Sequence, residues 1–252
     1  MPLIAALLAI AITATMDFTG LLMFSALPLI LITIIFWWLF RLTKEEIGLK
    51  FGSIKYYGLA LLYPAIVLGA SALLAYIFKD FCTIGIDWPK TRLNITLAST
   101  VGILMVLLTE EGFFRGWLWG AMRKCGLKSN QTLYVTSLIF VIWHISAVTS
   151  GTEYGLPWNQ VPVYLINATL LGLIWGLMRS MSGSVIVPAV SHAVWNGFAY
   201  ELFGFGEKMG ALGISDTAFF GPEVGYLGIV LNGLFFLGLR RMQIHQNKKG
   251  DH

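Results

Sequence analysis

Two adjacent carboxylates and an arginine lie within a strongly apolar stretch of the chain, from Ile95 to Trp119. They are Glu110, Glu111 and Arg115, in the run Glu-Glu-Gly-Phe-Phe-Arg. A charged side chain costs roughly 2.5 to 3.5 kcal/mol at the centre of a membrane helix, so such groups need a partner or a task. On an α-helix Glu111 and Arg115 are four residues apart and share a face, whereas Glu110 points about 100° away. One carboxylate therefore has a structural partner, and the other is left for chemistry.

Two later apolar segments also carry polar side chains. His144 closes the run Phe-Val-Ile-Trp-His that begins at Phe140, and His192 and Asn196 are four residues apart, on one helical face. Counted from the expected cytoplasmic helix ends at about 1.5 Å per residue, Glu110 and these three residues lie roughly 12 to 20 Å deep. Within one or two helical turns of depth, the four groups can meet.

Each of these residues also has a structural explanation when it is taken alone. His144 can bond a neighbouring helix, Asn196 can join two helices, and Glu111 with Arg115 can be an ion pair that only holds the bundle. However, two Glu, one Arg, two His and one Asn in apolar segments would then each need a separate cause. The complete set favours a catalytic site.

The composition indicates a membrane protein. Of the 252 residues, 57% are hydrophobic and 12% are charged, whereas soluble domains carry about 25% charged residues. The apolar residues form runs of membrane-spanning length, so the predicted fold class is all-α, a polytopic transmembrane helix bundle of about eight helices. The net charge of +4 comes from separate short loops, and we expect the lipid bilayer as a partner and no nucleic acid.

A single membrane-embedded domain, residues 1–252, is expected, with core helices within 95–200 and a polar tail at 240–252. His245 and His252 lie in that tail and are expected to be solvated. The stretch from Glu201 to Val224 contains five glycines and a Gly-Pro pair, and is interpreted as a mobile external loop.

No Lys or Arg precedes the first apolar segment, which favours an uncleaved helix over a signal peptide. The predicted helical segments are roughly 3–15, 19–40, 57–78, 95–122, 131–149, 161–178, 185–200 and 225–239, and an alternative joins the first two into one bent helix.

Lys and Arg residues predict the orientation in the membrane. Twelve of them fall in the loops and tail on one side of the predicted bundle, against four on the other, Lys79, Lys90, Arg92 and Lys208. The positive-inside rule places both termini in the cytoplasm, with the protein in the cell membrane. Cys82 and Cys125 then lie on opposite sides and cannot form a bridge within one chain.

At these residues the sequence resembles the CAAX-processing and bacteriocin-processing family of intramembrane proteases, called CPBP or Abi. The family pattern is Glu-Glu-x-x-x-Arg, then Phe-x-x-x-His, then His-x-x-x-Asn on successive core helices. The same order occurs here over about residues 95–200, and Thr43 to Gly48 looks like the family's early cytoplasmic loop. The resemblance implies an intramembrane endopeptidase that acts on a membrane-associated protein or peptide, either a prenylated CAAX-type C-terminus or a peptide leader.

The resemblance also implies roles for the site residues. Glu110 would activate water as the base and His144 would help to hold that water, while Arg115 would fix Glu111 and the local helix. His192 and Asn196 would donate hydrogen bonds to the developing oxyanion. This chemistry suits the residue types, because desolvation makes a carboxylate a better proton acceptor and preorganised donors are most effective away from bulk water.

Metal dependence and function have alternatives at this point. Glu and His could ligate Zn²⁺, but a catalytic zinc site uses three protein ligands and a water, and the family resemblance favours a metal-independent mechanism with no cofactor. The chain has no His-Glu-x-x-His helix. A non-catalytic immunity or scaffold protein is the alternative function, and a proton-coupled transporter is a third, although no paired internal repeats are visible.

Overall fold

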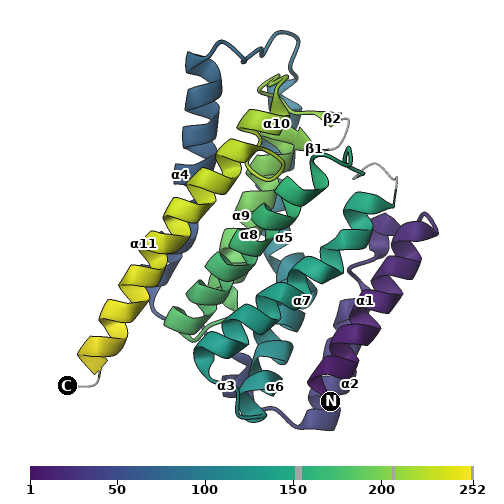
Figure 1. Ribbon diagram of the computed structural model, residues 1–252, viewed down its shortest axis with the longest axis vertical. Coiled ribbons are helices and arrows are strands. Elements are labelled where there is room, and N and C mark those ends of the chain that lie inside the picture. Colours follow the sequence, from purple (N-terminus) through teal and green to yellow (C-terminus); the bar gives the residue numbers. More distant parts are fainter. Residues whose placement is uncertain (151–154, 206–207, 251–252) are drawn as a thin grey trace.

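The apolar segments form helices because a helix satisfies its own backbone hydrogen bonds where water is absent. In the computed structural model, which describes residues 1–150, 155–205 and 208–250, these helices form a bundle with one short hairpin (Figure 1). Its elements in chain order are α1 (Pro2–Phe18), η1 (Leu22–Phe24), α2 (Pro28–Phe40), α3 (Lys44–Ile47), α4 (Ile54–Ile77), α5 (Trp88–Leu108), η2 (Gly112–Leu118), α6 (Trp119–Lys124), α7 (Ser129–Thr149), α8 (Val161–Ser182), α9 (Ile186–Phe203), β1 (Gly204–Phe205), β2 (Lys208–Met209), α10 (Thr217–Phe220) and α11 (Tyr226–Gly250).

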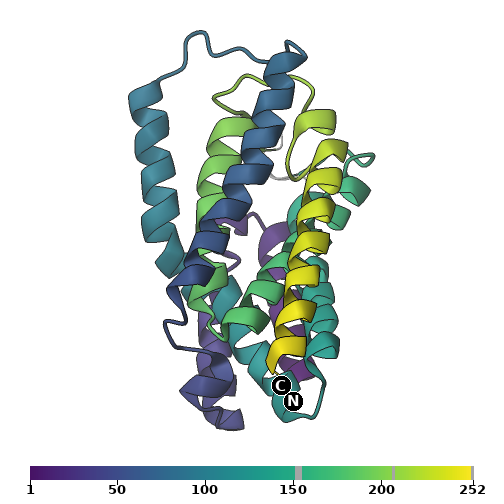
Figure 2. The ribbon, with the colours of Figure 1, turned by 90° about the vertical axis from the view of Figure 1, so that its left-hand side faces the viewer.

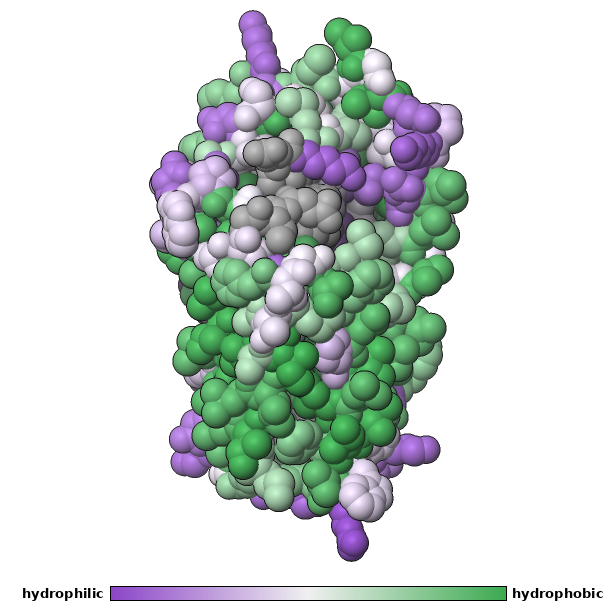
Figure 3. Space-filling model, turned by 90° about the vertical axis from the view of Figure 1, so that its right-hand side faces the viewer, coloured by the Kyte–Doolittle hydropathy of each residue, from purple (hydrophilic) through white to green (hydrophobic). Residues whose placement is uncertain are grey.

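The predicted helical membrane bundle is confirmed. Six helical stretches within the described residues are long and apolar enough to cross a membrane, and α1 is a shorter apolar helix. Between polar ends, the outer face seen in Figure 3 is mainly hydrophobic, as expected of a surface that contacts lipid. α1 and α2 are separate helices joined through η1, so the alternative of one bent helix over residues 1–40 is wrong.

The two ends of the bundle differ in what they carry. Both termini, α3 and α6 lie at one end, whereas the hairpin and α10 lie at the other (Figures 1 and 2). The strongly basic loops 41–55 and 123–130 belong to the first end. We call the second end the hairpin end.

The helix that carries the two glutamates is interrupted beside them. α5 ends at Leu108, and the chain continues after Glu110 and Glu111 as a π-helical turn, η2. A Cβ on Gly112 would lie 2.3 Å from the carbonyl oxygen of Leu107, so only glycine fits at this break. π-Turns inside helices are frequent at functional sites, because they change the direction in which successive side chains project.

Two boundary predictions differ from the structure. The stretch from Glu201 to Val224, interpreted as a mobile external loop, contains the end of α9, the hairpin and α10, with residues 206–207 outside the described part. Asp80 anchors this stretch by accepting hydrogen bonds from Ser215 and from the backbone of Asp216. The predicted tail is also helical to Gly250; His245 is exposed as expected, while His252 lies outside the described residues.

We expect Gly112→Ala to destabilise the protein by about 1–3 kcal/mol, the usual cost of forcing extra atoms into a packed site. The matched control is Gly69→Ala in α4, where an added Cβ meets nothing within 4 Å. The thermal unfolding midpoint in detergent should fall for the first variant and stay level or rise for the second. Equal midpoints would contradict the close approach at Gly112.

Candidate active site

All six residues singled out in the sequence lie at one centre in the bundle. Glu110 and Glu111 lie at the break between α5 and η2, Arg115 in η2, His144 in α7, and His192 and Asn196 in α9. Although the two glutamates are consecutive in the chain, their side chains lie in different surroundings. Glu110 lines a cavity, and Glu111 is fully buried.

The carboxylate of Glu111 is shared by two cationic or potentially cationic partners. Its Oε1 atom lies 3.0 Å from Arg115 Nη1 and 3.0 Å from His192 Nδ1. Arg115 also donates from Nη2 to the carbonyl oxygen of Gly172 in α8, at 3.1 Å, and its guanidinium carbon lies 4.2 Å from the ring centre of Phe140. The predicted Glu111–Arg115 pair is therefore present, and it extends to His192.

Glu110 lies between the two imidazoles. Its Oε2 atom is 3.7 Å from His144 Nε2 and 3.9 Å from His192 Nε2, and the Glu110 side chain is 15% exposed. These separations are too long for direct hydrogen bonds and suit contact through a bridging group. Among the described residues, this Oε2 atom has no hydrogen-bond partner.

The hydrogen bonds of the two imidazoles indicate the tautomer of each ring, and so which nitrogen presents a lone pair to Glu110. His144 Nδ1 lies 2.8 Å from the carbonyl oxygen of Phe140, which can only accept, so Nδ1 carries the proton. His192 Nδ1 likewise donates to Glu111. In the neutral form of each ring, Nε2 is an acceptor, and His192 can donate from Nε2 only when both of its ring nitrogens carry a proton.

Aromatic rings hold the imidazoles in place. The His192 ring stacks on Trp175 of α8 with centres 3.8 Å apart and an angle of 15° between the planes. The rings of Phe140 and His144 pack with centres 4.3 Å apart. Because these contacts restrict ring rotation, the direction of both Nε2 atoms is set before any ligand arrives.

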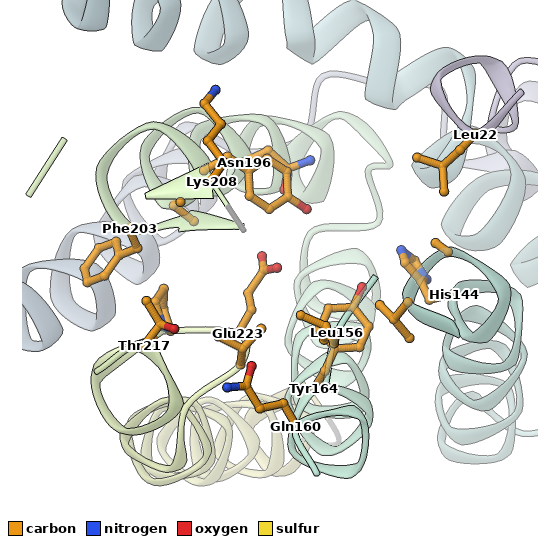
Figure 4. A pocket seen from close by; sticks show the side chains of 18 of the residues that line it. Leu22, His144, Leu156, Gln160, Tyr164, Asn196, Phe203, Lys208, Thr217 and Glu223 are labelled. Atoms are coloured by element: carbon orange, nitrogen blue, oxygen red, sulfur yellow. The ribbon is translucent and has the colours of Figure 1, made fainter. Parts of the chain in front are cut away.

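A cavity of about 320 Å³ lies beside this centre, and its lining includes Gly204, Lys208 and Thr217 of the hairpin end. Glu110, His144 and Asn196 line it, together with side chains from η1, α8, the hairpin and the loop before α11 (Figure 4). Within the described residues, the Asn196 side chain makes no hydrogen bond, so its amide is available to a ligand. A cavity of this size accommodates a few amino-acid residues of a substrate.

Glu223 is a cavity residue that the sequence did not single out. It lies in the loop between α10 and α11 and lines the same cavity (Figure 4). The Gly221-Pro222 pair before it is typical of a loop, and a lone acidic residue in a loop is usually solvated. The sequence therefore contains no signal that separates Glu223 from an ordinary surface carboxylate.

Within the described residues, no three or more His, Cys, Asp and Glu side chains are grouped so as to hold a metal ion. Glu110, His144 and His192 are the nearest candidates as ligands. His144 is bonded through Nδ1 to the carbonyl oxygen of Phe140, and His192 through Nδ1 to Glu111. The absence of a cofactor stays a prediction.

The fold and this centre define a class: a helical membrane-bundle protein in which carboxylates, imidazoles and an arginine meet inside the bundle. Residues 92–198 match the model of a family described as type II CAAX prenyl endopeptidase Rce1-like. The matched segment contains all six site residues, and it supports the family predicted from the three motifs, the CAAX-processing and bacteriocin-processing intramembrane proteases.

The chain is also similar to proteins of another description. It is 26% identical over 148 residues to autophagy-related protein 22 of Gibberella zeae, which is 54% of this chain and 20% of that protein. It is 26% identical over 153 residues to autophagy-related protein 22-1 of Neosartorya fischeri, 57% of this chain and 23% of that protein. The chain thus spans about a fifth of the length of these curated relatives. No solved structure matches it.

We expect Arg115→Met to lower the free energy of unfolding by about 3–5 kcal/mol, because it leaves the buried Glu111 carboxylate without its arginine. Arg92→Met, at an exposed position in α5, is the matched control and should change little. The double variant Glu111→Gln with Arg115→Met should recover part of the loss, since the uncompensated charge is gone. Denaturant unfolding in detergent measures all three; a double variant less stable than Arg115→Met would contradict the shared ion pair.

Proposed function

We propose that the protein is an intramembrane endopeptidase that hydrolyses a peptide bond in a membrane-associated protein or peptide. The observation that carries the proposal is the position of Glu110, at the cavity wall between two imidazole nitrogens 3.7 and 3.9 Å away. The family match supports the reaction class, since its description names a prenyl endopeptidase.

The reaction begins with a water held between Glu110 and His144. The Glu110 carboxylate takes one proton from this water, and the hydroxide attacks the carbonyl carbon of the scissile peptide bond. His144 positions the water through Nε2, whose lone pair faces Glu110 because Nδ1 is bonded to Phe140. A base placed in this way contributes typically 10²- to 10⁴-fold to the rate.

The carbonyl oxygen becomes negatively charged in the attack and needs donors. The Asn196 amide lines the cavity and can donate directly. His192, which is oriented by Glu111 and by stacking on Trp175, supplies the second donor through Nε2 when both of its ring nitrogens carry a proton. Removing one such donor from a protease typically slows catalysis about 10²- to 10³-fold.

Two substrate classes fit the proposal, a prenylated CAAX-type C-terminus and a peptide leader. The family description names prenyl endopeptidases, which supports the first. A non-catalytic immunity or scaffold role is the alternative function. A scaffold would need no second carboxylate here, because Arg115 and His192 are already bonded to Glu111.

The orientation in the membrane follows from the basic loops. With the termini, 41–55 and 123–130 in the cytoplasm, the hairpin end, which lines part of the cavity, faces the opposite side. On this proposal the substrate reaches Glu110 from the non-cytoplasmic side of the cell membrane, which suits a peptide leader; a cytoplasmic CAAX-type C-terminus, which the family description supports, would require the opposite orientation.

We expect Glu110→Gln, which preserves size and removes the base, to abolish at least about 99% of cleavage events. New protein N-termini are compared by mass spectrometry in host membranes carrying wild type or the variant at equal abundance. Glu45→Gln, at an exposed site in α3, is the matched control and should give the wild-type profile. Matched profiles for wild type and Glu110→Gln would contradict proteolysis and favour the scaffold alternative. Repeating the wild-type reaction with a chelator tests metal dependence, and we expect no loss.

The two free cysteines report the orientation without any engineered site. Cys82 is exposed at the hairpin end, where its backbone N–H donates to Leu212, and Cys125 is exposed after α6 at the other end. A membrane-impermeant maleimide added to intact cells should label Cys82, while Cys125 should react only after permeabilisation. Cys82→Ser and Cys125→Ser assign the two signals. Labelling of Cys125 in intact cells would invert the orientation and place the cavity opening on the cytoplasmic side.

A further inference from the structure

Glu223 is an acidic residue on the cavity that the steps above do not use. In Figure 4 its carboxylate points from the loop before α11 into the space bounded by Asn196, His144 and Tyr164. It also borders the smaller hollow that contains His192. Placing an ionised carboxylate in this position costs desolvation energy, so other interactions or a function must account for it.

The Glu223 side chain is oriented by a buried tryptophan. Trp195 Nε1 donates a hydrogen bond to Glu223 Oε1, and Trp195 lies in α9 one residue before Asn196. The Trp195 ring is in turn stacked on Tyr63 of α4, with ring centres 5.0 Å apart and planes 9° apart. Both rings are fully buried, so the donor has little freedom to move away.

The backbone around Glu223 is held by a chain of buried amides. Asn167 of α8 donates to the carbonyl oxygens of Glu223 and Gly225, at 2.9 and 3.2 Å. Asn232 of α11 donates to Asn167 and to the carbonyl oxygen of Pro222, and accepts from the hydroxyl of Tyr63. Because burying these amides is favourable only when they are bonded, the loop is fixed to α8 and α11 directly and to α4 through Asn232 and Tyr63.

The surroundings of Glu223 raise the pKa of its carboxyl into the neutral range. Burial raises the pKa of the Glu223 carboxyl to about 7, an effect that the Trp195 hydrogen bond and His192 oppose and that Glu110 reinforces. A carboxyl with such a pKa holds its proton through part of the working range and can release it. Acid catalysis requires this property.

Peptide hydrolysis needs a proton at the leaving nitrogen, and the other groups of the site are committed. In the proposed reaction Glu110 and His144 Nε2 hold the attacking water, and His192 Nε2 and Asn196 face the carbonyl oxygen. Both Nδ1 atoms are bonded elsewhere, to Phe140 and Glu111. Glu223 faces the cavity from the loop, whereas Glu110 faces it from the helix break. The two carboxyl groups can therefore address opposite sides of one scissile bond.

We propose that Glu223 is the proton donor to the leaving amine, an inference that rests on the proposed peptide hydrolysis. Water adds to the carbonyl carbon as hydroxide, with its proton on Glu110. The carbon–nitrogen bond then breaks, its electron pair goes to nitrogen, and the Glu223 proton goes to the same nitrogen, which leaves a carboxylic acid and a free amine. The proton on Glu110 returns through the cavity water to Glu223, and both groups regain their starting forms.

The test compares two leaving groups. The peptide identified by N-terminal profiling is made with its scissile amide, and its acyl part is also made as an aryl ester, whose phenolate leaves without a proton donor. Glu223→Gln keeps an oxygen for Trp195 and loses the acidic proton. We expect this variant to slow amide cleavage about 100-fold or more and ester cleavage less than about tenfold, whereas Glu110→Gln should slow both.

A pH profile separates proton donation from a structural role. The rate of amide cleavage by wild type should fall as the pH rises through about 7, since Glu223 then loses its proton. This falling limb of the pH profile should be absent for ester cleavage. Trp195→Phe removes a donor to the ionised carboxylate, so it should move the limb to higher pH.

Amide cleavage by Glu223→Gln at the wild-type rate, or equal loss on amide and ester, would overturn the donor assignment while leaving the protease intact. Wild type that cleaves neither substrate would overturn the hydrolytic function itself, and the donor with it.

Discussion

The shared carboxylate of Glu111 is the interaction on which the rest of the site depends. A buried charge is tolerated only when its partners are in place, and here one oxygen accepts from Arg115 and His192 at 3.0 Å each. Arg115 in turn bonds Gly172 of α8. The helix break, α8 and α9 are thereby fixed relative to one another through a single ion cluster, and any shift of one helix would expose an unpaired charge to an apolar interior.

The position of Glu110 follows from this cluster and from the break beside it. Glu110 precedes Glu111 in the chain, so fixing Glu111 also fixes the backbone of its neighbour. The π-turn that starts at Gly112 lets successive side chains project differently from those of a continuous α-helix, and it forms because glycine can lie against the Leu107 carbonyl oxygen. One glutamate is thus buried and paired while the next one reaches the cavity.

Periodicity and spacing predicted the helical bundle and the pairing of Glu111 with Arg115, because both depend on contacts within one helix. The bond between Glu111 and His192 could not be predicted from spacing, because it joins residues 81 apart through the packing of separate helices. The predicted depths of His144 and Asn196 allowed a meeting but could not decide it. The break at Gly112 was also missed, because the apolar run from Ile95 to Trp119 has the length and composition of one continuous helix.

The loop before α11 shows most clearly why composition misleads. Its glycines and Pro222 are typical of a mobile segment, yet buried amides from α8 and α11 bind its carbonyl groups and hold Glu223 at the cavity. Those amides look like ordinary interhelical contacts when each helix is considered alone. Only the assembled bundle shows that their acceptors lie in the loop.

Two carboxyl groups at one poorly solvated cavity cannot both be ionised without cost, and this constraint divides their roles. Charge on Glu110 raises the pKa of Glu223, whose burial already favours the neutral form. Glu110 lies at the helix break between two imidazole nitrogens that face the same space, whereas Glu223 is bonded to the Trp195 indole. The surroundings of Glu223 therefore favour a proton on that carboxyl, and Glu110, beside the attacking water, is left as the base. Their difference in environment, rather than in residue type, makes one a base and the other an acid.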